Sequence, residues 1–191
     1  MGIMGENILP DFCTKRTLIL GCGNWLFGDD GFGPAVIKYL LEHYEIPDDV
    51  YVMDVGTGIR KLLFTLSLSS VRPQQIVIID AIDKGRNPGE IFELSLDDLP
   101  AEKIDDFSLH QVPSSNLARE LRDAGVCIRV IVCQVAHIPE GVQPGLSAIL
   151  QQAVPRVGER IAEDYFCNKT PSFPMVGPVL TARKVQQKQK A

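Results

Sequence analysis

Residues 17–33 read TLILGCGNWLFGDDGFG, and this stretch decides the fold class of the chain. Its first four residues form a continuous apolar run that ends in Gly-Cys-Gly, which is typical of a buried strand leading into a turn. Immediately afterwards, apolar side chains recur at helical spacing from Pro34 to Tyr44, and Pro34 suits the first turn of a helix. The stretch therefore predicts a strand, a glycine-rich turn and a helix, which together form the first unit of an α/β fold.

Strands and helices alternate along the rest of the chain. The expected strands are 50–55, 76–80, 89–94 and 127–135, and the expected helices are 59–66, 114–125 and 146–166. Strands separated by helices form parallel sheets that are covered on both faces. Only the strand 89–94 follows its predecessor without a helix, so we expect it to be antiparallel. The prediction is a three-layer α/β fold with a twisted, mostly parallel five-stranded sheet and helices on both faces.

Single residues predict two details of the helices. Ser114 or Ser115 can cap the start of the helix that stops at Gly125. Pro155 predicts a kink or a restart in the last helix, because proline removes a backbone hydrogen bond and clashes with the preceding turn.

Length and composition favour one domain. The chain has 191 residues, of which 45% are hydrophobic. We place the α/β domain at residues 15–167, between an N-terminal extension, 1–14, and a basic tail, 168–191.

The five cysteines are odd in number and form no CxxC pair, which fits reduced thiols in a cytoplasmic protein. No apolar run reaches the roughly 18 residues that a membrane span needs, so no membrane partner is expected.

The charge of the chain is unevenly distributed. The whole chain has a formal net charge of −5, while its tail carries five basic residues and no acidic one. Residues 1–167 therefore hold 14 basic and 24 acidic side chains, a net charge of −10. An acidic body argues against nucleic acid as a partner.

Acidic residues follow three of the expected strands, where sites form in open α/β sheets. Asp29 and Asp30 follow the first strand, Asp54 closes the second and Asp80 the third. The first turn is not a dinucleotide fingerprint, because Leu26 stands where that fold needs glycine or alanine, and two carboxylates would repel a pyrophosphate. Structural roles remain alternatives: Asp30, and more readily Asp29, could cap the first helix, and Asp80 could hold a neighbouring loop.

The chain has three histidines, and His110 is the one that we place in the site. His43 lies in the first helix and is expected on the surface, while His137 follows the last strand and could approach the same end of the sheet. His110 lies in the long loop before the 114–125 helix. Two strand-end carboxylates and one imidazole make a plausible three-ligand metal site with open positions, or an acid–base site. The spacing does not name a substrate.

Four motifs in order are similar to those of the hydrogenase maturation endopeptidases, the proteases that finish the large subunit of nickel–iron hydrogenases. They are Gly21-Cys-Gly-Asn-Trp-Leu-Phe-Gly-Asp-Asp-Gly-Phe-Gly33, Asp54-Val-Gly-Thr-Gly58, Ile78-Ile-Asp80-Ala-Ile82 and Ser108-Leu-His110-Gln111. The resemblance runs over about residues 15–165. Within the family, the first motif resembles the version found with the deazaflavin-reducing hydrogenase of methanogens.

The resemblance implies a peptidase whose partner is a hydrogenase large-subunit precursor. Such an enzyme removes a short C-terminal extension after nickel has been inserted. Carried over to this chain, the residues that contact the metal and act in catalysis are Asp30, Asp80 and His110. Many members have glutamate where this chain has Asp30, and whether Asp29 shares the role stays open. The turn formed by Asp54, Gly56, Thr57 and Gly58 is expected to hold the substrate or to orient the site.

The metal implied by the resemblance is nickel carried by the substrate, and no tightly held organic cofactor is expected. A metal could polarise the scissile carbonyl or a bound water, and a carboxylate could act as general base. Cys22 is disfavoured as a nucleophile, since no Ser-His-Asp or Cys-His pattern accompanies it. Two other classes remain as alternatives: a non-proteolytic metal-loading chaperone for the same hydrogenase, which the lack of a His- or Cys-rich tract disfavours, and a small-ligand-binding α/β domain.

Overall fold

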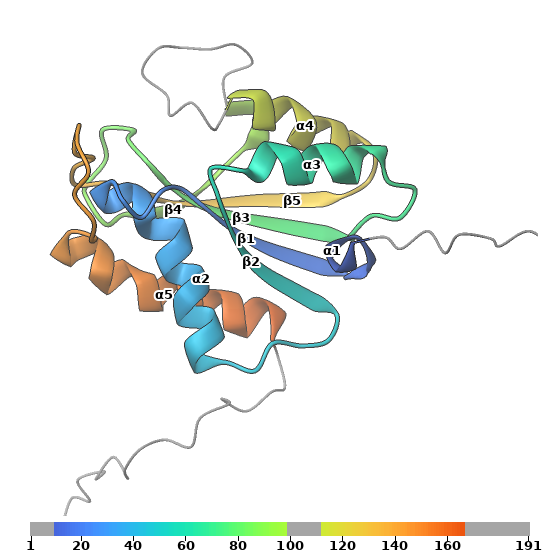
Figure 1. Cartoon of the computed structure of the whole chain (residues 1–191), viewed down its shortest axis with the longest axis horizontal. Coiled ribbons are helices and arrows are strands. Elements are labelled where there is room, and N and C mark those ends of the chain that lie inside the picture. The colour runs from blue at the N-terminus through green and yellow to red at the C-terminus, as the bar shows by residue number, and fades with distance from the viewer. Residues whose placement is uncertain (1–9, 99–111, 167–191) are drawn as a thin grey trace, which may run out of the picture.

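The chain folds into one five-stranded sheet with helices on both faces (Figure 1). The computed structural model describes residues 10–98 and 112–166. The strands are β1 (Thr17–Cys22), β2 (Val50–Gly56), β3 (Gln75–Ile82), β4 (Ile91–Leu94) and β5 (Cys127–Gln134). The helices are α1 (Asp11–Thr14), α2 (Phe32–His43), α3 (Ile59–Leu68), α4 (Val112–Asp123) and α5 (Ala148–Tyr165), with short 3-10 turns η1 (Gly28–Gly31) and η2 (Leu96–Asp98).

The strand order is β2-β1-β3-β5-β4. Four strands are parallel and one is antiparallel, as the sequence predicts. β1 pairs in parallel with β2 and β3, and β3 pairs in parallel with β5. β4 is antiparallel to β5, as expected for a strand that follows its predecessor without a helix. Because four strands run in the same direction, the loops that follow β1, β3 and β5 gather at one end of the sheet (Figure 1).

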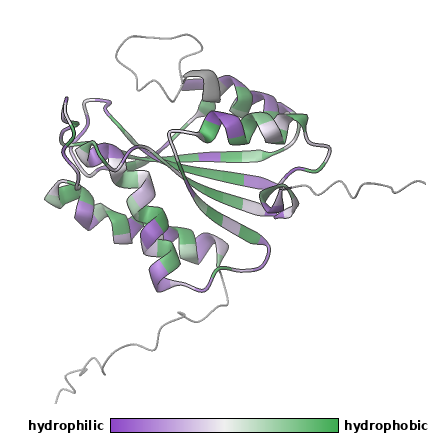
Figure 2. Cartoon of the chain, in the orientation of Figure 1, coloured by the Kyte–Doolittle hydropathy of each residue, from purple (hydrophilic) through white to green (hydrophobic). Residues whose placement is uncertain are grey.

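Two separate apolar layers cover the faces of the sheet. One layer joins alternate residues of the strands to α2 and α5, and the other joins the remaining alternate residues to α1, α3 and α4. In Figure 2 the strands are mostly hydrophobic, whereas the helices carry both hydrophobic and hydrophilic residues. This is the pattern of buried strands and amphipathic helices. Within the described ranges, no helix combines the length and the apolar character that crossing a membrane requires.

Helix α2 lies unusually close to β1 because both carry a glycine at the contact. A β-carbon on Gly33 would lie 2.2 Å from the carbonyl oxygen of Cys22 and 2.5 Å from that of Ile79. A β-carbon on Gly21 would lie 2.4 Å from Ile37 Cγ1. The two glycines thus allow the start of α2 to approach the carboxyl end of β1, where the acidic motif begins.

The predicted cap of α4 and the predicted restart of α5 are wrong. α4 already includes Val112, so Ser114 and Ser115 lie inside the helix and do not cap it. Pro113 suits a first helical turn, because a proline there removes an N–H that has no helical partner. α5 continues through Pro155 from Ala148 to Tyr165. Its apolar face, including Val154 and Val157, is buried against the sheet, and this packing outweighs the lost hydrogen bond.

Candidate active site at the carboxyl ends of the parallel strands

Cys22, the last residue of β1, marks the centre of the acidic cluster. Its side chain is buried, and burial raises the pKa of its thiol well above the ordinary value. The carboxylates of Asp80, Asp54 and Asp30 raise it further, in that order, because negative charges disfavour a thiolate. Three of the predicted acids therefore lie close enough to act on one atom at the end of β1. The thiol stays protonated, which removes Cys22 as a nucleophile.

Asp30 lies in the turn η1 between β1 and α2. Its Oδ2 accepts a hydrogen bond of 2.7 Å from the backbone N–H of Asn24, and its carbonyl accepts a second one of 3.2 Å from the same N–H. The N-cap of α2 is Gly31, and no side chain caps this helix. The alternative in which Asp30 caps the helix is therefore wrong. Instead, the half-buried carboxylate is fixed to the glycine-rich turn.

Gly23 makes this turn possible. Its φ of 120° is a conformation that side chains with a β-carbon rarely adopt, and a β-carbon there would lie 1.9 Å from the carbonyl oxygen of Asp30. The close approach of the two backbones brings Asp30 beside the end of β1.

Asp80 lies near the carboxyl end of β3, which continues to Ile82. Asp80 is two residues from Ile78 and two residues from Ile82, so all three side chains lie on the same face of the strand. Ile78 and Ile82 face the layer formed by α3 and α4, and the side chain of Asp80 therefore lies on that face. The half-buried carboxylate accepts a 2.8 Å hydrogen bond from the N–H of Ala81, which orients it. Asp80 and Cys22 belong to neighbouring strands and lie on the same face.

Asp54 lies on the opposite face of the sheet. It alternates with Met53 and Val55, which pack with the α3 and α4 layer, so it projects on the α2 side. Its Oδ1 accepts a 2.8 Å bond from Gly56 N–H, and Gly56 has a φ of 51°. The carbonyl of Gly56 accepts a bond from Gly23 N–H. The predicted Asp54–Gly58 turn, in which Thr57 is exposed and Gly58 precedes α3, is thereby joined to the Asp30 turn.

The predicted third ligand, His110, lies outside the described residues, so the three-ligand site stays a prediction. Among residues 10–98 and 112–166, no three His, Cys, Asp or Glu side chains are grouped so as to hold a metal ion. His43 is exposed on α2 and stacks on Tyr39, as a surface residue. His137 is exposed in the loop after β5.

Asp29 has a structural role, as the sequence favours, but it holds a distant loop and does not cap the helix. Its side chain is only 1% exposed. One carboxylate oxygen accepts bonds from the N–H groups of Ala136 and His137 and from the hydroxyl of Ser147, and the other accepts a 2.7 Å bond from Ser147 N–H. These donors come from the two ends of the loop 136–147. Asp29 therefore clamps this loop to the turn that carries Asp30.

A second contact joins the same two segments. Gly28 N–H donates to the carbonyl of Gln143, and Gln143 N–H donates to the carbonyl of Leu26, both at 2.9 Å. Phe27 and Gln143 form a short parallel bridge. The loop 136–147 is thus fixed at its ends by Asp29 and near its middle by backbone hydrogen bonds.

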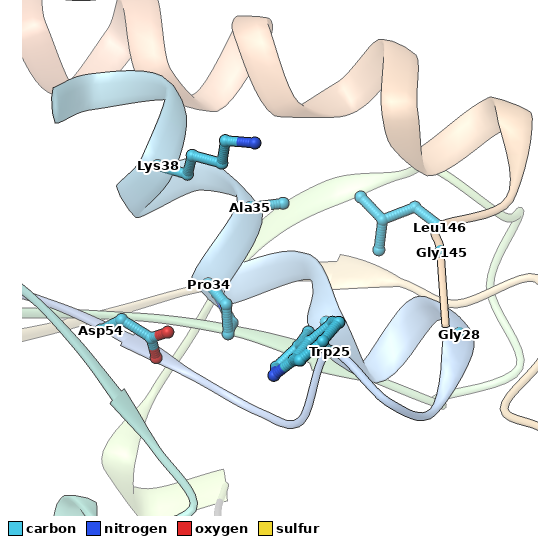
Figure 3. A pocket seen from close by; sticks show the side chains of 9 residues that line it. Trp25, Gly28, Pro34, Ala35, Lys38, Asp54, Gly145 and Leu146 are labelled. Carbon is cyan, nitrogen blue, oxygen red and sulfur yellow. The ribbon is translucent and has the colours of Figure 1, made fainter. Parts of the chain in front are cut away.

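An open pocket of about 420 Å³ lies between this loop, the turn η1 and α2 (Figure 3). Its lining residues are mostly apolar or glycine, with one basic and one acidic side chain: Trp25, Gly28, Gly31, Pro34, Ala35, Lys38, Asp54, Gly145 and Leu146. Asp54 belongs both to this pocket and to the cluster around Cys22. The pocket therefore adjoins the acidic cluster on the α2 side of the sheet.

Thiol labelling tests the environment of Cys22. We expect an alkylating reagent at mildly alkaline pH to modify the exposed Cys127 while Cys22 stays unmodified, because its thiol is buried and its pKa is raised. Mass spectrometry of the digested protein would assign the label to each peptide, and labelling in denaturant serves as the control. Rapid labelling of Cys22 in the folded protein would contradict the arrangement of buried thiol and surrounding carboxylates.

Comparison with known proteins identifies a family for this fold and acidic motif. A family model described as hydrogenase maturation protease matches residues 34–164. A Methanocaldococcus jannaschii protein named as a hydrogenase maturation protease is 39% identical, over 77% of this chain and 94% of its own length. The coenzyme F420 hydrogenase subunit delta of Methanothermobacter thermautotrophicus is 32% identical, over 80% of this chain and 96% of that subunit.

Solved structures show the same architecture. The hydrogenase maturating endopeptidase HybD from Escherichia coli is 28% identical with a TM-score of 0.61, over 78% of this chain and 91% of that one. The NiFe hydrogenase maturation protease HycI from Thermococcus kodakarensis is 27% identical with a TM-score of 0.58, over the same shares. Sequence and fold agree, and the chain belongs to the hydrogenase maturation protease family, whose members are peptidases.

Proposed function

We propose that this peptidase removes the C-terminal extension from the large-subunit precursor of a nickel–iron hydrogenase, and that it does so after nickel has been inserted. The observation that carries the proposal is the pair of half-buried carboxylates, Asp30 and Asp80, held at one end of the sheet by backbone N–H groups. The metal belongs to the substrate. The similarity to an F420 hydrogenase subunit supports a precursor of that hydrogenase type, in the cytoplasm of a methanogen.

In this mechanism Asp30 and Asp80 approach the nickel of the precursor, and His110 is the predicted third contact. Carboxylates and imidazole are suitable ligands for divalent metals, and two oxygens with one nitrogen leave coordination positions for the thiolates of the substrate. The site then recognises a loaded precursor and places its scissile bond beside a carboxylate. As a general base of the aspartyl type, this carboxylate takes a proton from the water whose oxygen attacks the scissile carbonyl carbon. The proton then passes to the leaving amine as the C–N bond breaks, which frees the C-terminal extension.

The dependence on nickel can be tested directly. Purified protein is mixed with nickel-loaded and with nickel-free precursor, and the mass of the large subunit is followed. We expect only the loaded precursor to lose its C-terminal extension, because a nickel-free precursor offers no metal for Asp30 and Asp80 to bind. Equal cutting of both precursors would remove nickel recognition from the proposal while leaving the peptidase activity.

The same samples test the chaperone alternative. A metal-loading chaperone would bind nickel stably on its own and would leave the mass of its partner unchanged. Equilibrium dialysis of the free protein against nickel, alongside the mass measurement, separates the two functions.

A further inference from the structure

Trp25 is an exposed aromatic residue on a fixed backbone. Its side chain is 63% exposed, although tryptophan is usually largely buried. The backbone on either side is held by hydrogen bonds from Asn24 N–H to Asp30 and from Phe27 N–H to the carbonyl of Asn24. A β-carbon on Gly31 would lie 2.8 Å from Trp25 Cα, so the turn packs directly against this residue. The indole is thus presented to solvent by a rigid segment.

The walls of the pocket beside Trp25 are held by hydrogen bonds within the chain. The turn η1 contributes Gly28 and Gly31, and the opposite wall consists of Gly145 and Leu146. That wall is the end of the loop clamped by Asp29, next to Ser147. A preformed pocket loses less conformational entropy on binding than a mobile one. Its volume of about 420 Å³ lies within the usual range for ligand sites, roughly 300–1,000 Å³.

The charges around the pocket define what it can accept. Trp25, Pro34, Ala35 and Leu146 form an apolar middle, as Figure 3 shows. Lys38 is the one basic side chain among the lining residues, and Asp54 is the one acidic side chain. Lys38 is 75% exposed and lies 3.8 Å from Glu42. Because the body of the chain is strongly acidic, Lys38 is a local site at which an acidic group of a partner is attracted. An extended polypeptide with an apolar side chain next to an acidic one fits this combination.

We propose that this pocket docks the precursor polypeptide next to the bond to be cut, with an apolar side chain on Trp25 and an acidic group facing Lys38. The proposal rests on the proposed function and deepens it. The same turn carries Asp30 and lines the pocket, and Asp54 belongs to both the pocket and the acidic cluster. A segment lying on Trp25 therefore lies beside the turn that carries Asp30.

Substitution of Trp25 gives the main test, with nickel-loaded precursor as substrate. Trp25→Ala is expected to raise KM about 10- to 30-fold, the loss typical of a central aromatic anchor, and to leave kcat within about twofold. Trp25→Phe should restore part of the affinity, since a flat aromatic surface remains. The matched control is Phe64→Ala on α3, which removes a 53% exposed aromatic side chain in the other helical layer. It should change neither constant.

Substitution of Lys38 tests the charge part. Lys38→Met keeps the length of the side chain and removes its charge. We expect KM to rise about two- to fivefold at low salt, and the difference from the unchanged protein to shrink as salt is added. An unchanged KM and salt dependence would remove the acidic group from the proposal.

The outcomes separate this inference from the proposed function. If the unchanged protein fails to cut the loaded precursor, the proposed function is wrong. If it cuts, and Trp25→Ala has an unchanged KM, the function stands and the docking site is wrong. Because Trp25 is the only tryptophan of the chain, fluorotryptophan labelling gives a single protein resonance. In a complex isolated by gel filtration that resonance should shift, and an unshifted resonance would place the precursor elsewhere.

Discussion

Asp80→Asn is expected to lower kcat for cleavage of the nickel-loaded precursor by about 10²–10⁴-fold, the usual contribution of a general base or metal-contacting carboxylate. Asparagine has the same shape and keeps an oxygen that can accept the bond from Ala81 N–H. It also removes one of three negative charges around Cys22, so the thermal stability should not decrease. The measurement is single-turnover cleavage followed by mass spectrometry, together with thermal unfolding of the same sample.

Asp83→Asn is the matched control for Asp80. Asp83 lies three residues further along the chain, is exposed, and accepts hydrogen bonds from Gly85 N–H and Gln134 Nε2 in the turn before β4. The same chemical change there should leave cleavage within about twofold, because this carboxylate only orders a turn. Cleavage by Asp80→Asn at the rate of the unchanged protein would exclude Asp80 from the mechanism.

The second large effect is expected on stability. Asp29→Ala should decrease the free energy of unfolding by about 3 kcal/mol, because four part-buried donors lose a charged acceptor and each lost hydrogen bond costs about 1 kcal/mol. For a chain of this size the melting temperature would fall by roughly 6–12 °C. Urea unfolding measures the free energy, and calorimetry the melting temperature.

Ser147→Ala is the control for this loss of unfolding free energy. It removes the hydroxyl bond to Asp29 but leaves the bonds from three backbone N–H groups, so a decrease of only about 1 kcal/mol is expected. Equal losses in the two variants would show that Asp29 does not hold the loop through its other three donors.

The fold could be predicted because its signals are local. The apolar runs of β1 and β3 identify buried strands, and the missing helix before β4 indicates that this strand is antiparallel. The sequence was less informative about helix boundaries, since α4 begins before Ser114 and α5 does not restart at Pro155.

The acidic site could be predicted only in part. The rule that sites form at the carboxyl ends of parallel strands brings Asp30, Asp54 and Asp80 to one end of the sheet, where their charges raise the pKa of Cys22. The distribution of these acids over two faces could also be predicted, because side chains alternate along a strand. The role of Asp29 was not accessible, because its donors at Ala136, His137 and Ser147 lie more than 100 residues away and include backbone groups that any sequence provides.

The clamp formed by Asp29 also bears on the order in which the protein is made. The acidic turn is synthesised early, whereas the donors that fix it belong to residues 136–147. A chain still on the ribosome therefore carries Asp29, Asp30 and Asp80 before it can complete their surroundings. The arrangement around the turn can be complete only when β5 and the beginning of α5 have emerged.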